Sequence, residues 1–229
     1  LYIFPVGFIG CMIAGSLNGL GSLFFYIGLA RVDANLSQLL FSLYPVFVAI
    51  LLFLDGLKHS KTTFIALLLS IPAVYLLTKT STLGFDLRDA VFPLLAGMFY
   101  ALHIPINQRV LYEAPAPTVT LYTLFAMTMV VIPAELIFSP ASFDIPQPAL
   151  IPLIGLTLVT FFSRLALFSG VKSIGGMRTS LLGLGQLIVT ICVAYIWLGE
   201  TLTPFQWLGA FLLICALILV GIDKPIAAP

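Results

Sequence analysis

Long apolar stretches recur along the chain, and short polar segments separate them. A helix that crosses a membrane needs about 20 mostly apolar residues, whereas a barrel strand needs about 9–11 residues of alternating polarity. The stretches are too long and too evenly apolar for barrel strands, so the pattern predicts helices. Charged residues, prolines and glycines divide them into eight predicted spans, at 7–29, 34–54, 62–78, 90–111, 118–138, 149–171, 177–198 and 204–222.

The polar connectors between the spans predict caps and an orientation. Ser60 and Thr203 are expected to cap the helices that follow them, and Pro204 suits the first turn of the last helix. Cytoplasmic loops are enriched in lysine and arginine. If the first span starts inside, the inner connectors hold Lys58, Lys61, Arg109, Lys172, Arg178 and Lys224, and the outer ones hold Arg31, Lys79 and Arg88. This imbalance predicts that both ends of the chain face the cytoplasm.

The composition excludes a soluble protein. Of the 229 residues, 61% are hydrophobic and 8% are charged, and the mean hydropathy is +1.16. A soluble domain carries about 25% charged residues, so this chain has too few charges to cover a water-facing surface. We therefore predict an all-α polytopic membrane protein that lies in the lipid bilayer of the cell membrane.

Charge and cysteine content exclude other classes. The net charge is +1 and there is no basic stripe, so nucleic acid is not an expected partner. Cys11, Cys192 and Cys215 stand alone within apolar runs, and no Cys-x-x-Cys pair occurs. We therefore expect no metal site, no disulfide framework and no cofactor.

The first part of the chain resembles the last part. The turn after the second span is predicted to fall inside and its counterpart before the last span outside, so the two copies would lie upside down to each other, as in secondary transporters. Chance similarity between two leucine-rich runs is the alternative. The segment 28–78 matches 170–221, with Gly28 on Gly170, Leu39-Leu40 on Leu181-Leu182, Gly56 on Gly199 and Ala73 on Ala216.

The copies predict two unequal repeats, 1–81 with three helices and 82–229 with five. We therefore expect eight transmembrane helices of a ten-helix inverted-repeat fold, with two helices of the parent protein before Leu1. The absent pair is expected to pack beside the first two spans, as the fourth and fifth spans are expected to pack beside the sixth and seventh. An apolar groove or an opened cavity is then expected beside the first two spans.

Two local motifs carry a resemblance to a known family. The stretch from Ala194 to Gly209 contains a Leu-Gly-Glu turn followed by a helix that opens with a glycine. The first half has Tyr44-Pro45 within a span, followed by Leu54-Asp-Gly-Leu57, a form of the same turn without the glutamate. In these features the chain resembles the EamA-type transporters of the drug/metabolite transporter superfamily.

The resemblance implies ten helices in two inverted five-helix repeats, a central cavity, and export or exchange of small metabolites. The second copy departs from the pattern, because Gln186-Leu187 stands where a proline is expected. Amino acids, nucleotide sugars, phosphorylated sugars and drugs are all substrates within the family, so the resemblance does not name one. Glu200 of the Leu-Gly-Glu turn is expected to pin the hairpin between the last two spans.

Polar residues recur every three or four positions on five of the spans, and each set forms one stripe on its helix. Polar groups inside a membrane usually face a cavity or another helix. The remaining spans, at 62–78, 118–138 and 204–222, are expected to be peripheral. The stripes are Gly15, Asn18, Ser22 and Tyr26; Gln38, Ser42, Tyr44 and Pro45; Tyr100, His103 and Asn107; Thr157, Thr160 and Arg164; and Thr179, Gly183, Gln186 and Thr190.

Arg164 is the charge that lies deepest within a predicted span. No acidic residue is expected at its depth, because Glu135 lies near the outer end of its helix and Asp55 at the inner edge. A guanidinium suits a carboxylate or phosphate through paired hydrogen bonds. The alternative is an arginine that extends to the inner headgroups. His103 is either a proton-linked group or a neutral packing residue, and Pro105 predicts a kink beside it.

The function that best fits this pattern is a secondary transporter, an exporter or exchanger of small metabolites with a central polar cavity. Its expected substrate is a small anion or zwitterion. A non-transporting scaffold or accessory subunit is the alternative. An intramembrane enzyme is disfavoured, because no Gly-x-Ser-x-Gly or His-Glu-x-x-His motif is present, so no catalytic residue is assigned. The helix faces leave a homodimer open. The expected substrate-binding residues are Asn18, Tyr44, His103, Asn107, Arg164 and Gln186.

Overall fold

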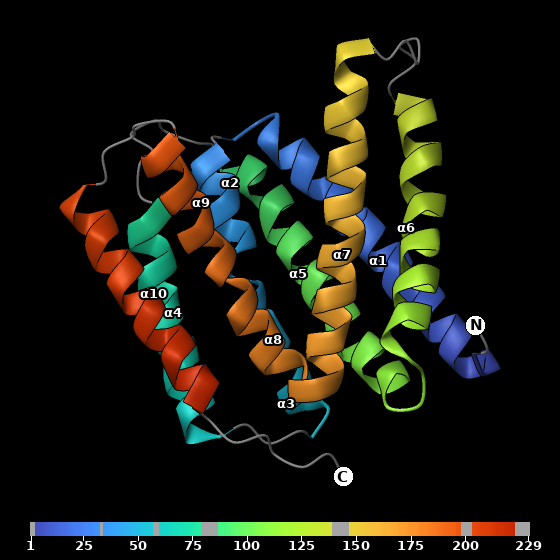
Figure 1. The fold of residues 1–229 in the computed structure, drawn as a ribbon, viewed down its shortest axis with the longest axis horizontal. Helices are drawn as coiled ribbons and strands as arrows, with labels where there is room; N and C mark the ends of the chain where they lie inside the picture. Colours follow the sequence, from blue (N-terminus) through green and yellow to red (C-terminus); the bar gives the residue numbers. More distant parts are fainter. Residues whose placement is uncertain are drawn as a thin grey trace.

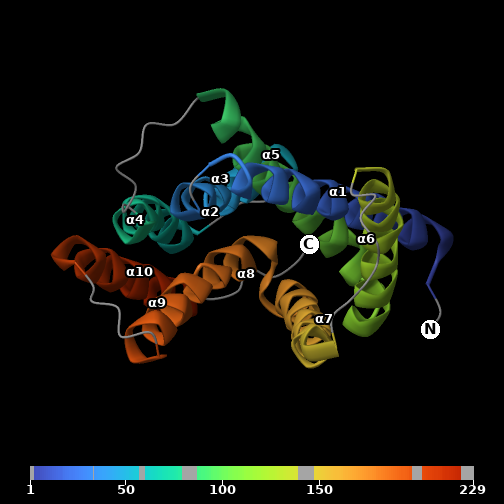
Figure 2. The same cartoon turned by 90° about the horizontal axis from the view of Figure 1, so that it is seen from above.

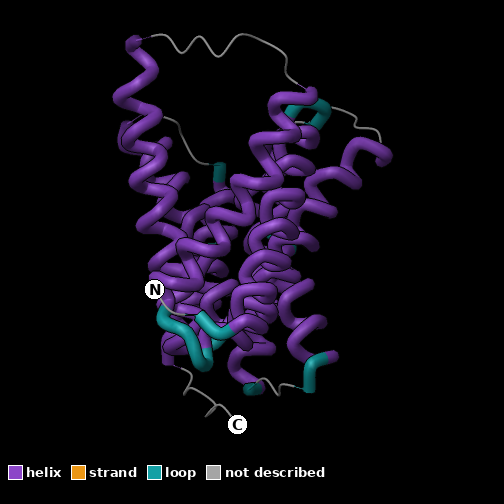
Figure 3. Tube along the Cα trace, turned by 90° about the vertical axis from the view of Figure 1, so that its right-hand side faces the viewer, coloured by secondary structure: helices purple, strands orange, loops and turns teal. Residues whose placement is uncertain are grey.

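The computed structural model describes residues 3–32, 34–56, 60–78, 87–138, 147–197 and 203–222. Within these ranges every regular element is a helix, and the helices run between the two ends of a bundle (Figure 1, Figure 3). In chain order they are α1 (Pro5–Leu29), α2 (Ala34–Phe41), α3 (Tyr44–Leu54), α4 (Lys61–Thr78), α5 (Leu87–Leu111), α6 (Ala116–Phe138), the 3-10 turn η1 (Gln147–Ala149), α7 (Leu150–Ile174), α8 (Gly176–Gly183), α9 (Gly185–Trp197) and α10 (Pro204–Ile222).

These helices occupy the eight predicted spans, with ends that differ by a few residues. In the described part of the chain, five helical segments are long and apolar enough to cross a membrane, and α4 and α10 carry shorter apolar stretches. The start of α1 and the end of α10 lie toward the same end of the bundle (Figure 1). The prediction of an all-α polytopic fold is confirmed, and the chain is an integral membrane protein.

The two predicted helix caps are confirmed. The Thr63 amide donates to Ser60 Oγ at 3.1 Å. At α10, the Gln206 amide donates to Thr203 Oγ1 at 3.3 Å, and the Thr203 amide donates to Gln206 Oε1 at 2.9 Å. This reciprocal pair satisfies two amides that a helix start leaves without partners. Glu200, which was expected to pin the turn before α10, lies outside the described residues.

Glycines on α1 let two other helices approach it closely. A Cβ on Gly15 would lie 2.6 Å from the Ala126 Cβ of α6 and would also clash with the Thr123 carbonyl. Further along α1, a Cβ on Gly21 would lie 3.2 Å from the Ala96 carbonyl of α5, and one on Gly28 would lie 2.8 Å from a Pro93 ring carbon. Small residues at such crossings are typical of helix packing in membranes.

This packing corrects one expectation. The helices at 87–111 and 116–138 pack mainly on α1, and not on α7 and the α8–α9 pair as predicted. The physical reason is that α1 carries the glycines that permit close contact, whereas residues 150–163 of α7 are exposed. Figure 2 shows α6 and α7 toward one end of the fold and α4 and α10 toward the other. Residues 150–163 of α7 are therefore left without the cover that α5 and α6 were expected to provide.

The second and seventh predicted spans are each interrupted, and α3 and α9 begin after the interruption. At both breaks the usual hydrogen bonds between residues four apart give way to bonds between residues three apart. Pro45 lacks an amide hydrogen at the first break, and Gly183 and Gly185 flank the second. The bonds are Leu43 N to Leu40 O at 3.3 Å and Val46 N to Leu43 O at 2.9 Å, and Leu184 N to Leu181 O and Leu187 N to Leu184 O, both at 3.0 Å.

The close contact between α1 and α6 generates a stability prediction. Gly15→Ala places a methyl group against the backbone of α6, and overpacking of this kind costs about 1–3 kcal/mol. Gly155→Ala is the matched control, because no atom lies within 4 Å of the position that a Cβ would take there, on the exposed part of α7. We expect thermal unfolding in detergent, followed by circular dichroism, to shift down for Gly15→Ala alone. Equal stability of the two variants would contradict the packing described.

Candidate functional site

Two adjoining cavities lie between the helices. The larger has a volume of about 700 Å³ and the smaller about 110 Å³. Three side chains line both, namely Phe41, Tyr100 and Arg164, so these residues form the junction between them. The smaller cavity is completed by Asn18, Gly21, Ser22, Phe25 and Tyr26. The larger is completed by Tyr44, Val159, Thr160, Ser163, Ala166, Leu167, Gly170, Ile174, Thr179, Leu182, Gly183 and Gln186.

The lining comes from five segments of the bundle. These are α1, the α2–α3 pair, α5, α7 and the α8–α9 pair. They are the segments on which the sequence carries polar stripes. Neither cavity has a lining residue from α4, α6 or α10, the helices that lack such stripes. Helical periodicity therefore indicated which helices line the two cavities.

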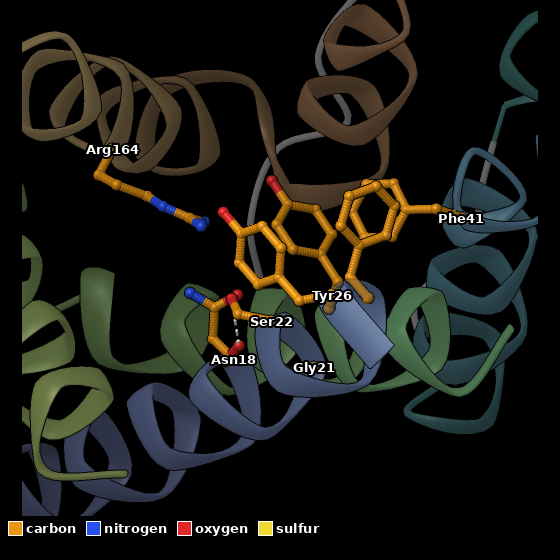
Figure 4. Close-up of a pocket in the computed structure, with 8 residues that line it drawn as sticks. Asn18, Gly21, Ser22, Tyr26, Phe41 and Arg164 are labelled. Carbon is orange, nitrogen blue, oxygen red and sulfur yellow. Dashed lines mark hydrogen bonds between the residues drawn. The ribbon is translucent and has the colours of Figure 1, made fainter. Parts of the chain in front are cut away.

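Arg164 reaches from α7 into the junction and points toward the side chains of α1 (Figure 4). The carbon of its guanidinium lies 5.5 Å from the centre of the Tyr100 ring, within the distance at which a cation is attracted to an aromatic face. Among the described residues no carboxylate pairs with it, since Asp55 pairs with Arg109 and Asp89 with Arg31. The charge is partly buried and faces the cavities.

Tyr100 is the centre of an aromatic cluster that the sequence reasoning missed as a site. Its ring centre lies 5.3 Å from that of Phe41, 4.9 Å from that of Tyr44 and 4.6 Å from that of His103. Tyr100 belongs to a predicted polar stripe but was not among the expected substrate-binding residues. Phe41 belongs to no polar stripe and was not expected at the site. Aromatic residues are common throughout this chain, so only their contacts reveal the cluster.

Tyr44 connects the two interrupted helices. Its hydroxyl donates to the Ser180 carbonyl of α8 at 2.7 Å. In a regular helix the Leu184 amide would donate to that carbonyl, but here it donates to Leu181 at 3.0 Å. A Cβ on Gly183 would clash with the Tyr44 hydroxyl. The tyrosine therefore satisfies a backbone acceptor that the break leaves open, and a glycine provides the space.

Asn18 and Gln186 line different cavities. Asn18 is buried beside the smaller one, and its amide donates to the Met127 sulfur at 3.4 Å. Gln186 is exposed and lines the larger one, near the start of α9. Both amides therefore lie on the walls around Arg164, on opposite sides of the junction.

His103 and Asn107 lie behind these walls. Both are fully buried, and neither lines either of the two cavities. His103 Nδ1 bonds to the Tyr100 carbonyl, and Asn107 Oδ1 accepts from Thr123 Oγ1 at 3.3 Å. In the described part of the chain, His103 Nε2 and Asn107 Nδ2 have no hydrogen-bond partner. The structure thus brings Asn18, Tyr44, Arg164 and Gln186 to the cavities and keeps His103 and Asn107 in the second layer.

The described residues contain no group of three His, Cys, Asp or Glu side chains that could hold a metal ion. What the fold and cavities define is a polytopic membrane protein with one arginine, Arg164, at the junction of two cavities between its helices. Residues 89–222 match the sequence model of the EamA-like transporter family. Because this match covers more than half of the chain, the protein belongs to the EamA-like transporter family.

Two comparisons accompany this match. A protein of Archaeoglobus fulgidus described as an uncharacterized transporter is 28% identical over 192 residues, which cover 83% of this chain and 66% of that protein. The chain therefore spans 66% of that relative's length. A solved structure described as the crystal structure of a protein has a TM-score of 0.74 at 12% identity, over 97% of this chain and 89% of the other. At that identity the likeness concerns the fold alone.

The bond between Tyr44 and Ser180 generates a second prediction. Tyr44→Phe leaves the buried Ser180 carbonyl without its donor, and an unsatisfied buried group costs about 1–3 kcal/mol. Tyr26→Phe is the control, because that side chain is 69% exposed. We expect denaturant titration in detergent to show a loss of stability for Tyr44→Phe only. If Tyr44→Phe is as stable as the parent chain, the hydroxyl does not support the break.

Proposed function

We propose that this protein is a secondary transporter that exports or exchanges small metabolites through the two central cavities. The carrying observation is Arg164, a charge at the junction of two cavities that five helical segments surround. Family membership supports transport as the activity. A guanidinium placed there would bind the carboxylate or phosphate of an anionic or zwitterionic substrate through paired hydrogen bonds.

We further propose that residues 1–81 and 82–229 are two inverted repeats. The two helix breaks support this, because Leu40, Leu43 and Val46 of the first correspond to Leu181, Leu184 and Leu187 of the second. This offset of 141 is one residue less than the offset that pairs Leu39 with Leu181 in the sequence match. The long helices α1 and α7, each of 25 residues, precede the breaks, and α4 and α10 follow them. Interrupted helices at mid-depth in paired repeats are typical of substrate sites in secondary transporters.

The proposal includes a place and an orientation. We place the protein in the cell membrane, and its basic residues favour an orientation with both described ends of the bundle on the cytoplasmic side. In the proposed cycle the two repeats rock around Arg164, so that the cavities open first to one side and then to the other. The breaks at Leu43 and Leu184 give the helices points at which such a movement needs few rearranged hydrogen bonds.

Substitution of Arg164 tests this function. Arg164→Lys keeps the charge but loses the planar pair of donors, so we expect weaker transport of anions by proteoliposomes. Arg164→Gln removes the charge and is expected to weaken transport further and to favour neutral substrates. Arg31→Lys is the control, because Arg31 pairs with Asp89 away from the cavities.

The readout is uptake of labelled organic anions, with folding of each variant checked by circular dichroism and size-exclusion chromatography. Unchanged anion uptake by a folded Arg164→Gln variant would exclude Arg164 from the site. If the parent chain folds and inserts but moves no metabolite in a broad panel, a scaffold role replaces the proposal.

A further inference from the structure

The lining of the two cavities is unbalanced in charge. Among the residues that the structure describes, it contains Arg164 and a set of neutral polar side chains, but no aspartate or glutamate. A charged group that leaves water needs an opposite charge or a full set of hydrogen bonds. The site therefore offers a partner for a negative group and no ionic partner for a positive one.

The aromatic surroundings do not replace the absent carboxylate. An ammonium group can bind over the face of an aromatic ring, and one of the two rings that line both cavities is Tyr100. Its face is already covered by the guanidinium of Arg164, at 5.5 Å from the ring centre. An ammonium group placed beside a carboxylate bound at Arg164 would also meet the repulsion of that guanidinium.

The cavities differ in size, and the lining of each combines apolar and polar side chains. The larger volume, about 700 Å³, lies within the range of about 300–1,000 Å³ that small-molecule sites occupy. Its wall includes the apolar side chains Val159, Leu167, Ile174 and Leu182, with the polar side chains Thr160, Ser163, Thr179 and Gln186 between them. The smaller, about 110 Å³, adds the Asn18 amide and the Ser22 and Tyr26 hydroxyls beside Arg164. A polar head therefore fits at the junction, and an apolar body fits in the larger cavity.

Resting on the proposed function, we infer that the substrates are net-anionic carboxylates with an apolar body, and that the site discriminates against zwitterions of the same shape. The carboxylate lies at Arg164, where the planar guanidinium matches its two oxygens. The body lies against Phe41, Tyr100 and the apolar wall of α7. Selectivity comes from what the lining lacks, because an ammonium group must lose its water without gaining an ionic partner.

A matched series of probes tests this inference in proteoliposomes containing the full chain. Phenylpropanoate, phenylalanine and phenylethylamine share one aromatic body and are an anion, a zwitterion and a cation. We expect uptake of phenylpropanoate to exceed that of phenylalanine at least about tenfold, since an unpaired charge beside a like charge is strongly disfavoured. Phenylethylamine should not be taken up above the protein-free background.

A change of specificity provides the second arm. Ser163 follows Phe162 on α7 and lines the larger cavity next to Arg164. Ser163→Asp supplies the missing carboxylate, and we expect the preference to shift toward phenylalanine. Ser163→Asn has nearly the same shape without the charge and should keep the preference for phenylpropanoate. Circular dichroism shows whether each variant is folded before uptake is compared.

The outcomes separate this inference from the proposed function. Uptake of phenylalanine equal to or greater than that of phenylpropanoate overturns the anion preference and leaves a transporter. Preference for a hexose phosphate over phenylpropanoate overturns the apolar-body part. If a folded parent chain takes up none of these probes, both the proposed function and the inference fail.

Discussion

A guanidinium among apolar helices is stable only where water, hydrogen-bond acceptors or an anion surround it, since a charge at mid-membrane costs about 3 kcal/mol or more. Arg164 meets this constraint at the junction of two cavities. The polar stripes on five helical segments supply hydrogen-bonding side chains to the cavities that this charge lines. The helices that lack such stripes, α4, α6 and α10, contribute no side chain to the lining of either cavity.

The breaks in the second and seventh spans follow from a related constraint. Backbone groups in a membrane need partners inside the protein or in a water-filled cavity. At the second break the Ser180 carbonyl finds its partner in Tyr44, which belongs to the first interrupted span. The two breaks therefore depend on each other, and both lie beside the larger cavity. This dependence links the geometry of the site to the packing of the two halves of the chain.

Much of the fold could be predicted from sequence, because span length, apolar runs and caps such as Thr203 are local properties. The polar stripes likewise identified the helices that face the cavities. The partners of each helix could not be predicted, since periodicity gives a face and not a neighbour. For this reason α5 and α6 were expected beside α7 instead of α1. Neither break was predicted, since Pro45 lies within a stretch that was expected to be one continuous span, and no proline stands at the second break near Leu184.

The residues of the candidate site could likewise be predicted only in part. Arg164 stood out because a charge within a span is rare, whereas Phe41 and Tyr100 resemble the many other aromatic residues of the chain. His103 and Asn107 share a helix stripe with Tyr100, but the side of α5 on which they lie packs against other helices. Only some residues of a polar stripe reach a cavity. Which of them line its wall depends on how the helix packs against its neighbours, and the sequence of the helix does not specify that packing.

The central claim is that the surroundings of Arg164 are accessible from water and bind anions. Cysteine accessibility tests it most directly, with Cys11, Cys192 and Cys215 replaced by alanine. We predict that a charged thiol reagent labels Ser163→Cys, that phenylpropanoate slows this labelling, and that added Arg164→Gln removes the protection. Phe162→Cys, whose parent side chain is 61% exposed and lines neither cavity, should stay unlabelled in the bilayer. Equal labelling at both positions, or protection that persists without Arg164, would contradict the account.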